Sequence, residues 1–129
     1  MRARRIHTSA TADLGSAVIH MEGGYDRTPE GVAQLTTNLG SLLRGGMRAV
    51  RFTGSAGMNM VAVACGRADG YVERGPKIWD FCAGKVIVEE AGGSVVMPDG
   101  KQFDLLSRSI VVASTPGLAK VLCDTVTLG

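Results

Sequence analysis

Gly75-Pro76-Lys77-Ile78-Trp79-Asp80-Phe81-Cys82-Ala83-Gly84 is the segment that decides how this chain folds, and it leads directly into Lys85-Val86-Ile87-Val88-Glu89-Glu90-Ala91-Gly92-Gly93. A Gly-Pro turn delivers an acid to the first turn of a helix, and a glycine pair ends that helix. Apolar residues recur at the i, i+3, i+4, i+7 spacing of a buried stripe. The predicted stripe comprises Trp79, Cys82, Ala83, Val86, Ile87 and Ala91. Asp80 lies off this stripe, and the pattern alone favours a helix-start residue there, because unpaired N–H groups and the helix dipole attract an acid.

The composition is that of one folded domain: 129 residues, of which 45% are hydrophobic and 20% charged. A net charge of +2 with scattered basic residues indicates no nucleic-acid partner. No apolar run approaches the ~20 residues of a membrane span, so no membrane segment is predicted. The cysteines are odd in number and lack C-x-x-C spacing, so we interpret them as reduced core residues in a cytoplasmic protein. They are Cys65, Cys82 and Cys123.

The chain divides into a lead-in over residues 1–15 and a domain over residues 16–129. The lead-in is rich in Arg, Ser and Thr, which suits either the start of a truncated chain or a short transit peptide. In the domain, predicted strands alternate with predicted helices, which indicates an α/β sheet layered by helices; a short mixed sheet fits equally well. Strands are expected at 16–21, 47–52, 69–73, 94–96 and 109–113, and helices are expected to start near residues 29, 58, 79 and 116.

Three features at chain turns are candidates for ligand binding. The small-residue loop over residues 53–57 opens a helix, so its backbone N–H groups are candidates to receive an anion or a hydroxyl, although tight helix packing explains the glycines equally well. Glu73 ends a strand, and its simpler interpretation is solvation or pairing with Arg74 or Lys77. Asp80 is a candidate ligand for a hard divalent cation, since Mg²⁺ prefers oxygen donors; one carboxylate alone does not make a metal site.

Several of these segments together resemble the inositol monophosphatase family. The matching motifs, in the family's order, are Arg27-Thr28-Pro29-Glu30, Gly54-Ser55-Ala56-Gly57-Met58-Asn59-Met60, Ala68-Asp69-Gly70-Tyr71-Val72-Glu73, Trp79-Asp80-x-x-Ala83-Gly84, Glu90-Ala91-Gly92-Gly93 and Phe103-Asp104-Leu105. The Trp-Asp-x-x-Ala-Gly element is that family's C-terminal signature. The resemblance runs from about Ser16 onward and covers the C-terminal half of the enzyme, which implies half of an αβαβα sandwich.

The resemblance implies roles for particular residues. Asp80 matches a ligand of the family's Mg²⁺ cofactor, and Glu73 matches an acid that binds a ring hydroxyl. Gly54, Ser55 and Ala56 match the turn that contacts the inositol hydroxyls. Tyr25 replaces a substrate-contacting Ser, which leaves the exact substrate open. No catalytic residue is assigned within this chain.

The family's other metal ligands come from an upstream Glu-Glu loop and an Asp-Pro-x-Asp-Gly-Thr loop, and neither motif occurs here. Two hypotheses follow. One is Mg²⁺-dependent hydrolysis of a phosphomonoester such as inositol 1-phosphate, to which this chain contributes one metal ligand and the inositol-binding wall without being active alone. Related sugar- or nucleotide-phosphate substrates stay open. The other is a non-catalytic module that pairs with a full-length subunit or with itself, since family members are commonly homodimers.

Overall fold

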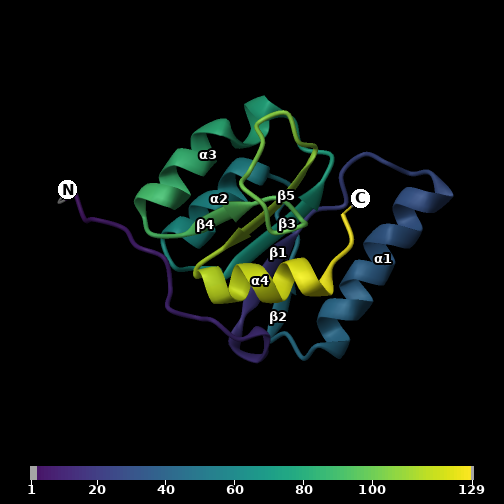
Figure 1. Cartoon of the computed structure of the whole chain (residues 1–129), viewed down its shortest axis with the longest axis horizontal. Helices are drawn as coiled ribbons and strands as arrows, with labels where there is room; N and C mark the ends of the chain where they lie inside the picture. Colours follow the sequence, from purple (N-terminus) through teal and green to yellow (C-terminus); the bar gives the residue numbers. More distant parts are fainter. Residues whose placement is uncertain (1–2, 129) are drawn as a thin grey trace.

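Five strands form one mixed sheet in the order β2-β1-β3-β5-β4 in the computed structural model, which describes residues 3–128 (Figure 1). β1 pairs in parallel with β2 and β3, whereas β5 runs antiparallel to β3 and β4. The strands are β1 (Val18–Met21), β2 (Ala49–Arg51), β3 (Gly70–Arg74), β4 (Ser94–Val96) and β5 (Ser109–Ala113). The predicted α/β class is confirmed, and the sheet is of the mixed kind.

Four α-helices begin where the sequence signals predicted. Thr28 precedes α1, and its side-chain oxygen accepts a hydrogen bond from the Gly31 amide at 3.1 Å. Thr115 caps α4 in the same way, through the Leu118 amide at 3.2 Å. In both cases a proline follows at the first helical position, where its missing N–H costs nothing. The helices are α1 (Pro29–Arg44), α2 (Ala56–Ala64), α3 (Ile78–Glu90) and α4 (Pro116–Thr125), preceded by the short 3₁₀ turn η1 (Leu14–Ser16).

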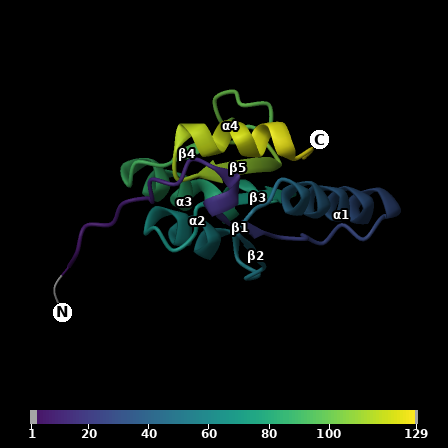
Figure 2. The same cartoon turned by 90° about the horizontal axis from the view of Figure 1, so that it is seen from below.

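The helices cover the sheet in two layers, with α4 on one face and α2 and α3 on the other (Figure 2). Successive residues of β3 point to opposite faces, so Val72 joins the core beneath α4 while Tyr71 joins the core beneath α2 and α3. Every residue of β5 is buried, as expected for a strand covered on both sides. Burying each large apolar side chain stabilises the fold by roughly 1.5–3 kcal/mol.

The prediction for the buried face of α3 is wrong. The helix buries Phe81, Gly84 and Val88 instead, while Trp79 is 71% exposed and Val86 is 59% exposed. Cys82, Ala83 and Ile87 are exposed as well, and only Ala91 of the predicted stripe is buried.

Close packing at Gly84 explains which face of α3 is buried. A Cβ added to Gly84 would lie 2.6 Å from Met60 Sδ of α2, so only glycine permits this approach. The ring of Phe81 also meets that of Phe103 edge-on, with centroids 5.1 Å apart. Because α3 is apolar on both sides, periodicity could not tell which side faces the sheet.

The segment before η1 is hydrogen-bonded to one end of the sheet. The Thr8 amide donates to the Ala91 carbonyl at 3.1 Å, and Ser9 Oγ donates to Asp69 Oδ1 at 2.5 Å. Ser114 Oγ donates to the Thr11 carbonyl at 2.9 Å. These bonds join residues 8–11 to the sheet and to the end of α3; residues 1 and 2, which belong to the predicted lead-in, lie outside the described part of the chain.

All three cysteines are free thiols. Cys65 and Cys123 are half-buried, but Cys82 is exposed, so the interpretation of Cys82 as a core residue is wrong. Its exposure follows from the face that α3 turns toward the sheet. Within residues 3–128, every helix is too short or too polar to cross a membrane.

Candidate functional site

Four carboxylates line a cleft of about 740 Å³ bounded by α1, the loop after β1, the loop after β3 and Leu128. They are Glu22, Asp26, Glu73 and Asp80, of which Asp26 lies 3.6 Å from Arg74. The strand register explains how two of them meet: Met21 of β1 lies opposite Val72 of β3, so the next residues along the parallel strands are Glu22 and Glu73. Because parallel strands end at the same edge of a sheet, residues far apart in the sequence share this edge.

Glu73 is partly buried, and the Tyr71 hydroxyl donates a hydrogen bond to its Oε2. Burial raises the pKa of Glu73; the hydrogen bond from Tyr71 opposes this, and the nearby carboxylates of Glu22 and Asp80 add to it. Burial also raises the pKa of Tyr71 far above its usual value, with the Glu73 charge as the next cause. Tyr71 therefore keeps its proton and holds Glu73 in place.

The simpler interpretation of Glu73, pairing with Arg74 or Lys77, does not describe this site. Arg74 instead donates to Gln34 Oε1 at 2.9 Å and lies 3.6 Å from Asp26 Oδ2. Within residues 3–128, Tyr71 is the hydrogen-bond partner of the Glu73 carboxylate.

Asp80 occupies the first turn of α3, as the sequence predicted. Its Oδ2 accepts a hydrogen bond from the Lys77 amide at 2.8 Å, which fixes the carboxylate at the helix start. The side chain is exposed and faces the cleft. Its other oxygen, Oδ1, has no hydrogen-bond partner within residues 3–128, so it is available to a ligand.

The turn before α2 is held by a carboxylate that the sequence argument did not single out. Glu22 Oε1 accepts hydrogen bonds from the amides of Thr53 and Gly54, each at 2.8 Å, and from Asn59 Nδ2 at 3.0 Å. The backbone N–H groups of Thr53 and Gly54 are therefore used within the protein rather than presented to an anion, which corrects that part of the prediction. A carboxylate that accepts hydrogen bonds from three N–H groups holds the turn before α2 firmly in place.

Asn59 is fully buried in α2 and connects this turn to β1. Its Oδ1 accepts from Thr53 Oγ1 at 2.6 Å and lies 2.7 Å from Nδ1 of the buried His20. An amide oxygen can only accept, so His20 Nδ1 carries the proton and donates. A polar residue inside an otherwise apolar helix was the sequence signal that could have identified Asn59.

Gly54, Ser55 and Ala56 form the start of α2. Ser55 Oγ accepts from the Met58 amide at 3.2 Å, and Gly54 has a φ of +83°, which favours glycine. The three residues do not line the 740 Å³ cleft and reach its edge through Glu22. A Cβ added to Gly57 would lie 3.9 Å from the Asp80 carbonyl oxygen, so α2 and α3 start side by side.

The carboxylates around the cleft suit a hard cation in type but not in number. Mg²⁺ takes oxygen ligands in octahedral geometry, and Asp80 Oδ1 is one such donor. Across residues 3–128, no cluster of three or more His, Cys, Asp or Glu side chains is close enough to hold a metal ion. The described residues therefore fit one ligand of a metal site rather than a complete one.

Comparisons with known proteins identify the family. The sequence profile described as the inositol monophosphatase family matches residues 1–127. The inositol monophosphatase of Dictyostelium discoideum is 35% identical over 111 residues, which are 86% of this chain and 41% of that protein. Inositol monophosphatase 1 of Bos taurus is 36% identical over 117 residues, which are 91% of this chain and 42% of that protein.

Comparison with solved structures leads to the same family. An inositol monophosphatase from Anabaena (Nostoc) sp. PCC 7120 superimposes with a TM-score of 0.81 at 33% identity, covering 93% of this chain and 46% of that one. The extragenic suppressor protein SuhB from Bartonella henselae gives 0.86 at 28% identity, covering 98% of this chain and 47% of that one. The chain belongs to the inositol monophosphatase family, and it spans less than half the length of these relatives.

Proposed function

We propose that this chain forms the metal-ligand and sugar-side wall of a Mg²⁺-dependent phosphomonoesterase, with a substrate such as inositol 1-phosphate. The observation that carries the proposal is the meeting of Asp80, Glu73 and Glu22 at one cleft edge beside the starts of α2 and α3. Helix N-termini favour anions, and the carboxylates favour a cation, so the two together suit a metal–phosphate pair. Family membership supports the same reaction class.

Asp80 contributes one oxygen ligand in this proposal. The Lys77 amide, 2.8 Å from Oδ2, holds that oxygen, so Oδ1 would be the atom that binds the cation. When bound, Mg²⁺ supplies Lewis-acid stabilisation of the phosphoryl and leaving-group oxygens. Residues 3–128 hold no cluster of three or more possible metal ligands, which is why the isolated chain is expected to be inactive.

The sugar side of the substrate is assigned to Glu73 and to the turn Gly54-Ser55-Ala56. Glu73 accepts a ring hydroxyl through the oxygen that Tyr71 does not occupy, and Tyr71 fixes its orientation. Glu22 and Asn59 hold the turn in its observed shape, so they act as positioning residues. Tyr25, which stands where the family has a substrate-contacting Ser, is fully exposed at the cleft rim, so the proposal extends to related sugar phosphates.

The alternative is a non-catalytic module that binds a subunit of the same family or a second copy of itself. The exposed apolar residues of α3 favour it, because such a face is typical of an interaction surface. We propose a cytoplasmic location for either role, and the three free thiols are compatible with a reducing compartment.

Phosphate release from inositol 1-phosphate, with Mg²⁺ and the purified chain, tests the proposal. The expected rate equals that of buffer. Turnover that disappears in Asp80→Asn would show a complete site within this chain and contradict the assignment of the other ligands elsewhere. Turnover that Asp80→Asn leaves unchanged would contradict the metal role of Asp80. Chemical shifts of the chain titrated with inositol should move at Gly54, Ser55 and Glu73, and unchanged shifts there would contradict the sugar-side assignment.

A further inference from the structure

His20 is a buried histidine in β1 that faces the helices α2 and α3. Its strand neighbours Ile19 and Met21 belong to the core beneath α4, and successive residues of a strand point to opposite faces of the sheet. The side chain is 8% exposed, and its Nδ1 lies 2.7 Å from Asn59 Oδ1 of α2. Burying a polar ring in an apolar strand is costly unless the ring has a hydrogen-bond partner, so the contact with Asn59 is the feature to explain.

The partners of Asn59 determine which way its amide group points. Oδ1 accepts from His20 Nδ1 and from the Thr53 hydroxyl, while Nδ2 donates to Glu22 Oε1 at 3.0 Å. The reversed amide would turn its oxygen toward the Glu22 carboxylate and its NH₂ group toward the N–H of the imidazole, so like groups would face each other at both ends. From these partners we assign His20 the Nδ1–H tautomer, which leaves Nε2 without a proton in the neutral ring.

Glu22 connects the Asn59 amide to the turn before α2. The oxygen that accepts from Asn59 also accepts from the backbone amides of Thr53 and Gly54, each at 2.8 Å. Because three donors converge on one atom, losing the Asn59 donor shifts that oxygen relative to the two backbone amides. The orientation of a single buried amide group therefore affects the shape of the turn.

The register of β1 and β3 gives His20 a counterpart in Tyr71. The two residues are paired across the strands, and each lies two positions before a cleft carboxylate, Glu22 or Glu73. Residues two apart in an extended chain point to the same face. Tyr71 donates a hydrogen bond to Glu73 directly, whereas His20 reaches Glu22 through Asn59. Two neighbouring ring side chains thus support the two carboxylates at this edge of the sheet.

We propose that His20 is a positioning residue for the turn Gly54-Ser55-Ala56, because its Nδ1–H group fixes the Asn59 amide and Asn59 in turn fixes Glu22. That the turn binds a sugar hydroxyl rests on the proposed function, whereas the effect of His20 on the shape of the turn does not. An apolar side chain of similar size at position 20 fills the same space but leaves the Asn59 oxygen without this donor, so packing alone does not supply the effect.

Three substitutions at position 20 separate the hydrogen bond from packing. His20→Asn keeps an N–H group at the place of Nδ1, His20→Gln moves it to the place of Nε2, and His20→Leu has none. Amide hydrogen exchange is measured by NMR on the purified chain. At Thr53 and Gly54 it should be about tenfold faster in His20→Leu and His20→Gln than in the original chain, and within about threefold of the original in His20→Asn.

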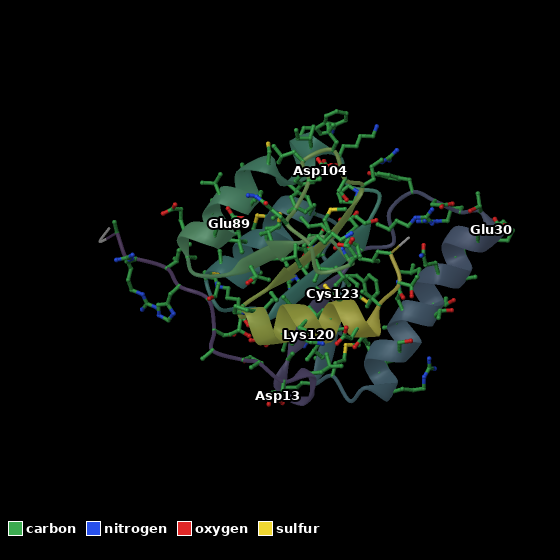
Figure 3. All side chains as sticks on the ribbon, viewed as in Figure 1. Asp13, Glu30, Glu89, Asp104, Lys120 and Cys123 are labelled. Carbon is green, nitrogen blue, oxygen red and sulfur yellow. The ribbon has the colours of Figure 1, made fainter. Side chains whose placement is uncertain are left out.

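The control is Lys120→Ala on α4, which lies on the opposite face of the sheet from α2 (Figure 3). Lys120 is exposed and pairs with Asp124 of its own helix, so its removal should leave exchange at Thr53 and Gly54 unchanged. The tautomer supplies a readout that needs no substitution. In the ring ¹H–¹⁵N spectrum of the original chain at neutral pH, Nδ1 of His20 should give the signal of a protonated nitrogen.

An Nδ1 signal without a proton would overturn the proposal. So would unchanged exchange in His20→Leu, or equal acceleration in His20→Asn and His20→Leu, because packing of the ring would then be the cause. Titration with inositol distinguishes this proposal from the proposed function. Accelerated exchange in His20→Leu, together with signals of the original chain that inositol does not move, would support the positioning role and contradict the sugar-side assignment of the turn.

Discussion

Replacing Asn59 with alanine tests whether the buried network holds the start of α2. The side chain is fully buried and contacts three partners: Thr53 Oγ1 at 2.6 Å, His20 Nδ1 at 2.7 Å and Glu22 Oε1 at 3.0 Å. Removing it leaves the buried His20 donor without its acceptor, which costs roughly 1–3 kcal/mol. It also removes one donor from the Glu22 carboxylate, a loss of up to roughly 1.5–3 kcal/mol that the two remaining backbone amides reduce.

The Thr53 hydroxyl is on an exposed residue and can bond water instead, so its loss adds little. We therefore expect Asn59→Ala to lower the free energy of unfolding by about 3 kcal/mol, a large part of the ~5–15 kcal/mol typical of a domain. Urea denaturation followed by circular dichroism measures this, with Lys120→Ala on the exposed side of α4 as a control that should change it by less than about 0.5 kcal/mol.

Hydrogen exchange supplies the second part of this test. The amides of Thr53 and Gly54 should exchange faster in Asn59→Ala, because the carboxylate that binds them is less firmly held. A loss of stability below about 1 kcal/mol, together with unchanged exchange at these two amides, would refute the role given to the network.

Further predictions concern the helix contact and the cleft carboxylate. Gly84→Ala should destabilise the fold by about 1–3 kcal/mol, because its new Cβ would meet Met60. The control Gly57→Ala, whose new Cβ would have its nearest neighbour at 3.9 Å, should be neutral or stabilising by up to about 1 kcal/mol. Equal effects of the two substitutions in urea denaturation would contradict this account of the packing. Glu73 has a raised pKa, so the folded state binds more protons than the unfolded state between the ordinary Glu value and the raised one, and stability should fall as pH rises through that window. Measured in EDTA, Glu73→Gln should remove this decrease of the free energy of unfolding with pH. For one proton the decrease cannot exceed about 1.4 kcal/mol per pH unit. The same pH dependence in the variant would show that another group causes it.

The elements of the fold were predictable because their signals are local. Thr28-Pro29 and Thr115-Pro116 mark helix starts through caps that act within three residues, and the structure forms both caps. Short apolar runs between turn residues likewise predicted all five strands. These interactions depend on neighbours along the chain, which a sequence displays directly.

The buried face of α3 was not predictable from periodicity, because the helix carries two apolar faces. Contact between Gly84 and Met60 settles which one meets the sheet, and this contact joins two different helices. The stripe that the sequence marked as core is the other apolar face of α3, and it is exposed.

The candidate site was predictable in part. Asp80 and Glu73, which the resemblance singled out, both line the cleft, and the turn at Gly54 adjoins it, while their roles in binding stay predictions. Glu22 was missed as a partner of that turn, because it lies 31 residues before Thr53 and the pairing of β1 with β2 brings the two together. Such a contact arises from topology, and no local pattern encodes it.

The central claim is that Asp80 is a metal ligand at the edge of this cleft. The most direct measurement is the paramagnetic broadening of backbone amide signals when Mn²⁺, an oxygen-seeking substitute for Mg²⁺, is added to the isotopically labelled chain with inorganic phosphate. We predict that broadening is strongest at Trp79, Asp80 and Phe81, extends to Glu73, and is lost in Asp80→Asn. Broadening of the same residues that persists in Asp80→Asn, or broadening confined to other acids such as Asp99, would contradict the claim.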